Sequence, residues 1–129
     1  MFNIMVVEDD RNTRKLMAAV LEQNGYTPVL AKDGLDALEV MDHTMVDLII
    51  LDVMMPNMDG YEFAQTLRES GCNLPILMVT AKETIQDKKK GFMLGVDDYM
   101  VKPVDEEEMI LRISALLRRS KIANEHKLT

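Results

Sequence analysis

The chain has 129 residues, of which 47% are hydrophobic, and a formal net charge of −7; this size and composition fit one folded domain rather than a disordered segment. The acidic excess argues against a nucleic-acid-binding surface on this chain, because such a surface needs a basic face. No apolar run approaches the roughly 20 residues that a membrane-spanning helix requires, and the single cysteine, Cys72, has no internal partner for a disulfide, so we expect a cytoplasmic domain without a membrane contact.

Five short apolar segments alternate with segments of helical periodicity. The apolar segments are Phe2–Val7, Thr27–Ala31, Leu48–Leu51, Ile76–Thr80 and Tyr99–Val101. Most of them are almost continuously apolar, which is typical of strands covered on both faces. The alternation predicts a strand followed by a helix five times over, and therefore an α/β fold with a doubly wound parallel sheet and right-handed crossovers.

The chain shows no internal repeat and no internal domain boundary. We expect one domain over residues 1–120 and a polar tail over residues 121–129 that is a frayed helix end or a linker. Asp10 and Asp33 are interpreted as helix caps or turn residues, which are common roles for Asp after a strand. Asp105 is placed to cap the last helix, with Glu108 at the capping-box spacing.

Polar side chains stand at the ends of four of the expected strands. Glu8 and Asp9 follow the first strand, Asp52 follows the third, Thr80 ends the fourth and Lys102 follows the fifth. Because parallel strands have their carboxyl ends at one edge of the sheet, where ligands bind in such folds, we expect these groups to converge.

The converging groups indicate a site for a hard divalent cation. The three carboxylates of Glu8, Asp9 and Asp52 outnumber the one ammonium of Lys102, and close carboxylates repel each other unless a cation offsets their charge. Oxygen ligands select Mg²⁺ or Mn²⁺, and Mg²⁺ in proteins is commonly held by one or two carboxylates, several waters and a phosphate oxygen. The sequence therefore predicts a site for a divalent cation at this edge of the sheet.

Five stretches in fixed order resemble the receiver domain of bacterial two-component response regulators, over residues 2–120. They are Ile4-Met5-Val6-Val7-Glu8-Asp9-Asp10, Asp47-Leu48-Ile49-Ile50-Leu51-Asp52-Val53-Met54-Met55-Pro56 with Asp59-Gly60, Pro75-Ile76, Val79-Thr80-Ala81, and Gly95-Val96-Asp97-Asp98-Tyr99-Met100-Val101-Lys102-Pro103. The resemblance implies a flavodoxin-like fold with strand order 2-1-3-4-5.

The resemblance also implies roles for the residues at the strand ends. Asp52 corresponds to the aspartate that accepts a phosphoryl group from a sensor histidine kinase. Asp9, Asp52 and the backbone carbonyl of Met54 correspond to the direct metal ligands, while Glu8 acts mostly through water. Such a domain is not an enzyme acting on other molecules; it catalyses only its own phosphorylation and dephosphorylation.

Three further positions complete the roles that the resemblance implies. Lys102 corresponds to the lysine that pairs with phosphoryl oxygens, and its bond to Pro103 is expected to be cis. Thr80 corresponds to the hydroxyl that moves toward the phosphoryl group. Tyr99 corresponds to the switch aromatic that turns inward into the space that Thr80 leaves.

Charges near the end of the chain are similar to those of the winged-helix subfamily of response regulators, called OmpR/PhoB-type. Lys88, Asp98, Glu108 and Arg112 match positions that pair across a homodimer when the domain is phosphorylated. A further pair common in that subfamily is absent, because Met93 and Ser114 stand at its positions. We expect DNA binding only through a missing C-terminal effector domain; a stand-alone receiver that acts through protein contacts is the alternative.

Two other classes of protein share part of this pattern of residues. A magnesium-dependent aspartyl phosphatase also uses an Asp after a strand, but it needs a second acid two residues later, where this chain has Met54. A flavin-binding domain needs a phosphate-binding loop rich in Ser, Thr or Gly after the first strand, where this chain has Glu8-Asp9-Asp10. Both alternatives are disfavoured.

Overall fold

The computed structural model describes residues 1–81 and 85–128, with side chains described for residues 1–81 and 87–121. Five parallel strands form one sheet in the order β2-β1-β3-β4-β5. The strands are β1 (Asn3–Val7), β2 (Thr27–Ala31), β3 (Leu48–Leu51), β4 (Ile76–Thr80) and β5 (Asp98–Val101). Each lies within one residue of its expected bounds, so the predicted flavodoxin-like α/β fold is confirmed.

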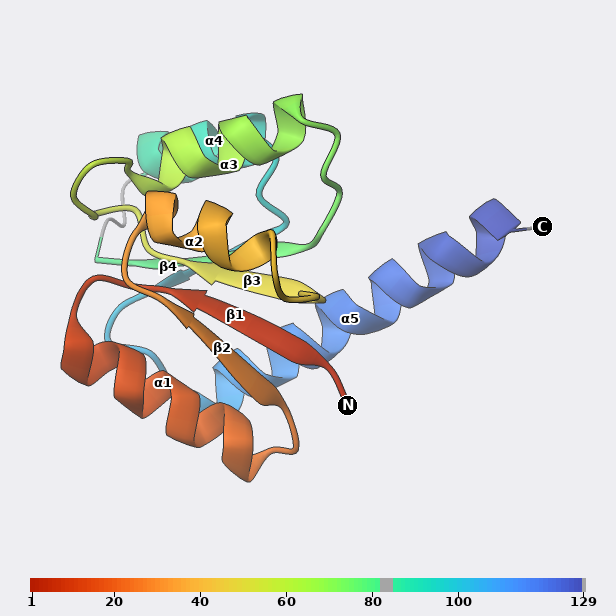
Figure 1. Cartoon of the computed structure of the whole chain (residues 1–129), viewed down its shortest axis with the longest axis horizontal. Helices are drawn as coiled ribbons and strands as arrows, with labels where there is room; N and C mark the ends of the chain where they lie inside the picture. The colour runs from red at the N-terminus through yellow and green to blue at the C-terminus, as the bar shows by residue number, and fades with distance from the viewer. Residues whose placement is uncertain (82–84, 129) are drawn as a thin grey trace.

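The five helices form two layers, one on each face of the sheet (Figure 1). They are α1 (Arg11–Gln23), α2 (Gly34–Met41), α3 (Gly60–Glu69), α4 (Ile85–Met93) and α5 (Glu106–Leu128). Helices α1 and α5 cover one face, and α2, α3 and α4 cover the other. Helix α5 continues past residue 120 and extends beyond the sheet (Figure 1).

The continuous apolar character of the central strands follows from this two-sided cover. Along β1, Met5 and Val7 pack in the core beneath α2 and α3, while Ile4 and Val6 pack in the core beneath α1 and α5. Successive side chains point to opposite faces of a strand, so both must be apolar when both faces are covered. The edge strand β2 differs, because it has one neighbour and Leu30 remains 42% exposed.

Aspartate side chains cap the N-termini of α1, α2 and α5. The carboxylate of Asp10 accepts from the N–H of Thr13 at 2.9 Å, and that of Asp33 accepts from the N–H of Asp36 at 2.8 Å. Asp105 likewise accepts from the N–H of Glu108 at 2.9 Å. These bonds satisfy N–H groups that have no partner within the helix, and they confirm the capping roles expected for all three aspartates.

Candidate functional site

The acidic cluster forms where β1 and β3 end side by side. Val7 and Leu51, the last residues of these strands, are register partners, so Glu8 and Asp52 leave the sheet together. One carboxylate oxygen from each of Glu8, Asp9 and Asp52 lies within 4.8 Å of the others. Glu8 and Asp52 are buried and Asp9 is exposed, so the cluster opens to solvent on the Asp9 side.

Lys102 closes the cluster from β5. Its ammonium nitrogen lies 2.5 Å from a Glu8 carboxylate oxygen and 3.1 Å from an Asp52 carboxylate oxygen. Its backbone N–H donates to the carbonyl of Thr80 at 2.8 Å, which ties the residue to the end of β4. The Lys102–Pro103 peptide bond is cis, as expected. Glu8 and Asp52 lie 94 and 50 positions before Lys102 in the chain, and both contact its ammonium group.

The buried acids shift the protonation of their neighbours. Burial raises the pKa of Glu8 to about 7, a hydrogen bond with Asp52 adds to the shift, and Lys102 opposes it. For Lys102, burial lowers the pKa, but the hydrogen bonds to Glu8 and Asp52 outweigh it and the pKa is raised. The site thus combines a permanent ammonium with a carboxyl group that exchanges its proton near neutral pH.

The loop after β3 is held tightly around Asp52. A Cβ atom on Gly60 would lie 2.3 Å from the backbone carbonyl oxygen of Asp52, so no larger residue fits there without movement of the loop. The backbone N–H of Met54 donates to an Asp52 carboxylate oxygen at 3.3 Å, which places Met54 beside the cluster. Asn57 has a positive φ of 70°, a conformation that Asn tolerates better than most residues.

Arg14 is a member of the site that the sequence analysis missed. Its guanidinium donates to the backbone carbonyl of Glu8 at 2.6 Å and to that of Asp9 at 3.4 Å. It therefore fixes the loop that carries both acids and brings positive charge to its outer side. The signal was available, because Arg14 stands one helical turn after the cap residue Asp10 and thus over the loop.

Thr80 and Tyr99 lie in the neighbouring strands β4 and β5. Thr80 is fully buried and is the register partner of Val101, the residue before Lys102. Tyr99 is 7% exposed, so its ring is already turned into the core in this structure. Thr80 is the last residue of β4, at the same edge of the sheet as Asp52, and Tyr99 lies two residues before the end of β5.

The charged residues expected at a dimer interface lie apart from the acidic cluster. Arg112 donates to both carboxylate oxygens of Asp98 at 2.9 Å and to Glu108 at 2.9 Å and 3.0 Å, within one chain. The Lys88 ammonium lies 5.9 Å from the centre of the Tyr99 ring. These residues together mark one face built from α4, β5 and α5.

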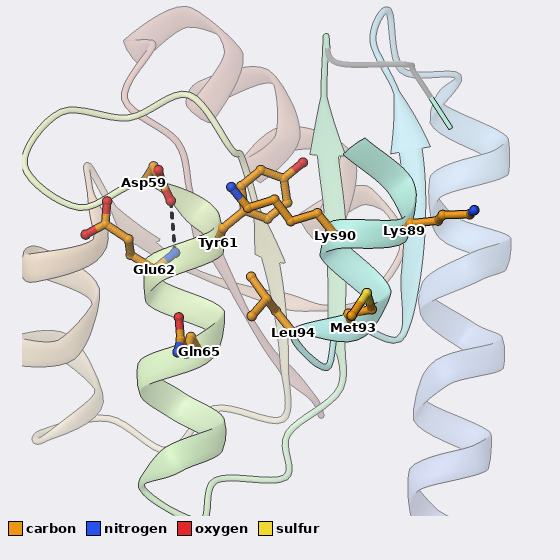
Figure 2. A pocket seen from close by; sticks show the side chains of 8 residues that line it. All are labelled: Asp59, Tyr61, Glu62, Gln65, Lys89, Lys90, Met93 and Leu94. Atoms are coloured by element: carbon orange, nitrogen blue, oxygen red, sulfur yellow. Dashed lines mark hydrogen bonds between the residues drawn. The ribbon is translucent and has the colours of Figure 1, made fainter. Parts of the chain in front are cut away.

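A pocket of about 440 Å³ lies between α3 and α4, away from the acids. Figure 2 shows its lining, with Tyr61 at the wall and the Lys90 side chain running over the Tyr61 ring. Met93 and Leu94 of the α4 region face Glu62 and Gln65 of α3 across it. Nothing in the sequence marked this pocket, because its walls come from segments about 30 residues apart.

Comparisons with known proteins find relatives of this chain. A family model described as "Response regulator receiver domain" matches residues 4–114. The chain is 44% identical over 122 residues to the response regulator MprA of Mycobacterium ulcerans, covering 95% of this chain and 53% of that protein. The chain therefore spans about half the length of this relative.

Solved structures show the same fold. The receiver domain of the Francisella response regulator 1452 superposes with a TM-score of 0.89 at 31% identity, covering 93% of this chain and 99% of that one. The Vibrio cholerae chemotaxis protein CheY4 superposes with a TM-score of 0.85 at 30% identity, covering 90% and 98%. Among the described residues, no helix is both long enough and apolar enough to cross a bilayer.

Proposed function

The chain belongs to the family of response regulator receiver domains, and on that premise we propose that Asp52 accepts a phosphoryl group from a sensor histidine kinase. The observation that carries the proposal is the contact between buried Asp52 and Lys102, set within a cluster that includes Glu8 and Asp9. A carboxylate with only a structural role does not require two further acids beside it. In phosphoryl transfer, however, neighbouring acids can hold a divalent cation that offsets charge on the phosphoryl oxygens.

In the proposed reaction an Asp52 carboxylate oxygen attacks the phosphorus of the donor. The bond between phosphorus and the donor's nitrogen or oxygen breaks, its electron pair leaves with the donor, and an aspartyl phosphate forms. The Lys102 ammonium, already 3.1 Å from the carboxylate, offsets negative charge on the transferring oxygens. The domain acts on no other substrate; it catalyses only its own phosphorylation and the later hydrolysis.

The donor set fits a hard divalent cation, and we propose Mg²⁺ or Mn²⁺ as the cofactor. Glu8, Asp9 and Asp52 offer oxygen atoms close enough to share one ion, with the Met54 carbonyl as a further ligand and Glu8 acting mostly through water. When bound, the ion neutralises charge on the phosphoryl oxygens. Arg14 supports this role from the protein side by fixing the loop of Glu8 and Asp9.

Thr80 and Tyr99 are proposed to report the phosphoryl group. The Thr80 hydroxyl would move to bond a phosphoryl oxygen, and the space that it leaves would favour the inward position of the Tyr99 ring. That ring is buried in this structure, and phosphorylation would act by shifting the population toward the state in which it is buried.

The wider function proposed is that of a cytoplasmic, winged-helix transcription regulator of which this chain is the receiver part. Two observations support this proposal. The relatives MprA are about twice as long as the region that aligns with this chain. In addition, α4, β5 and α5 together form a charged face. Phosphorylation would stabilise a homodimer through that face, and residues 121–129 would lead to the DNA-binding effector domain.

Incubation with acetyl phosphate, followed by intact mass, tests the central proposal. We expect a gain of one phosphoryl group that requires Mg²⁺ and is lost when the metal is chelated. A gain that is equally fast in the presence of a chelator would contradict the metal-assisted site.

A further inference from the structure

Two tyrosines from distant parts of the chain meet beneath α4. Tyr61 is the second residue of α3 and Tyr99 is the second residue of β5. Both belong to the same buried core, with exposures of 6% and 7%. Figure 2 shows the Tyr61 ring between α3 and α4, at the inner wall of the pocket.

The phenol group of Tyr61 is hydrogen-bonded to the backbone of α4. The Tyr61 hydroxyl donates to the backbone carbonyl of Asp87, in the first turn of α4, at 3.1 Å. Burial raises the pKa of both tyrosines, because a buried phenolate loses its hydration.

Helix α4 also covers both rings with cationic side chains. The Lys90 ammonium lies 4.5 Å from the centre of the Tyr61 ring, and the Lys88 ammonium lies 5.9 Å from that of Tyr99. Both separations are within the range of a cation–π attraction. Gly91 brings the helix backbone close, since a Cβ atom there would lie 3.7 Å from the Tyr99 ring. The position of α4 and the orientation of the two rings are therefore tied together.

We propose that Tyr61 is a positioning residue of the switch: its hydroxyl holds the first turn of α4, the helix that packs on the Tyr99 ring, and thereby couples the buried orientation of Tyr99 to the position of α4. The inference rests on the proposed function, in which Tyr99 reports the phosphoryl group. It adds Tyr61 as the residue that links Tyr99 to α4, and α4 belongs to the proposed dimer face. A ring that only filled space at this position would not need the hydroxyl.

Tyr61→Phe tests the proposal, because it keeps the ring and the contact with Lys90 and removes only the hydroxyl. In the unphosphorylated chain we expect amide hydrogen exchange in residues 88–92 of α4 to accelerate about fivefold, the change that loss of one ordinary hydrogen bond produces. We also expect the ring resonances of Tyr99, observed in tyrosine-labelled protein, to move toward those of an exposed ring.

A control variant makes the test specific. Tyr26→Phe is the matched control, since Tyr26 packs against the core on the opposite face of the sheet, and it is expected to leave α4 unchanged. If Tyr61→Phe matches the parent in α4 exchange and in the Tyr99 resonances, the proposal is overturned.

Loading with beryllofluoride separates this inference from the proposed function. If the parent chain binds beryllofluoride and α4 responds, Tyr61→Phe is expected to bind it as well, with a weaker response of α4. An equal response in both would overturn the coupling role. If the parent fails to bind beryllofluoride or to accept a phosphoryl group, the proposed function fails, whereas the measurements on the unphosphorylated chain still decide whether the hydroxyl of Tyr61 holds Tyr99 and α4.

Discussion

Arg112 donates to both carboxylate oxygens of Asp98 at 2.9 Å, and the two residues belong to the same chain. A two-fold dimer through this face would use each position twice, with Asp98 of one chain facing Arg112 of the other. Dimerisation would then exchange an ion pair within the chain for one between chains. Because one ion pair replaces another, the net gain in binding free energy is small. The pair therefore determines which partner binds and in which orientation more than how tightly it binds.

Reversal of this pair tests the dimer. Asp98→Arg alone is expected to weaken the dimer of the beryllofluoride-loaded domain at least tenfold, because two like charges then face each other across the interface. Adding Arg112→Asp should restore the dimer, since the opposite charges are present again. Sedimentation velocity measures both. A loaded domain that stays monomeric at about 1 mM, where an association of about −4 kcal/mol is visible, would refute the dimer itself.

Lys102→Met should slow phosphorylation by acetyl phosphate about 100-fold, because the variant loses the ammonium that offsets charge on the transferring oxygens. Methionine keeps a side chain of similar length, so the loss of packing is small. Lys121→Met is the control, since Lys121 is an exposed lysine of α5. Equal rates in the two variants would remove Lys102 from the proposed chemistry.

Metal binding should depend on pH through Glu8. Its carboxyl group has a pKa of about 7 in the metal-free chain, so at lower pH a proton must leave before Mg²⁺ binds. The affinity for Mg²⁺ is therefore expected to rise with pH and to be about tenfold weaker at pH 6 than at pH 8. Calorimetric titration measures it. Glu8→Gln should lose most of this dependence, and a parent affinity that is the same at both pH values would argue against the assignment.

Arg68 is predicted to matter for stability and not for chemistry. Its guanidinium donates to the backbone carbonyls of Gly95, Cys72 and Leu74 and to the Asp97 carboxylate. Arg68→Lys cannot reproduce this set of bonds, because an ammonium lacks the planar fork. We expect a loss of about 2 kcal/mol in the free energy of unfolding by urea, with an unchanged phosphorylation rate. An unfolding midpoint equal to that of the parent would show that the bonds add nothing net.

The strand ends and the helix caps could be predicted from the sequence because each depends on local chemistry. Apolar runs ended at Val7 and Leu51, and the acids that follow them had to meet at one edge of a parallel sheet. Asp10 and Asp105 stood in front of helical stripes with free N–H groups to satisfy. These features require no knowledge of side-chain packing.

The contacts that were missed depend on packing between segments far apart in the chain. The bond between Tyr61 and Asp87 joins residues 26 positions apart, and that between Arg68 and Gly95 joins residues 27 positions apart. No periodicity links such positions, so only the three-dimensional arrangement reveals them. The sequence analysis also missed the ion pair between Arg112 and Asp98 within the chain. The family resemblance implied instead that these two residues pair between chains.

The most direct test of the central claim is the intact mass of two variants after reaction with acetyl phosphate and Mg²⁺. Asp52→Asn removes the proposed acceptor. Asp33→Asn is the matched control, because Asp33 is about as buried, at 7% against 6%, and Asn serves equally well as the cap of α2. We expect the Asp33→Asn variant to gain one phosphoryl group and the Asp52→Asn variant to gain none. Full modification of the Asp52→Asn variant would contradict the assignment of Asp52 as the phosphoryl acceptor.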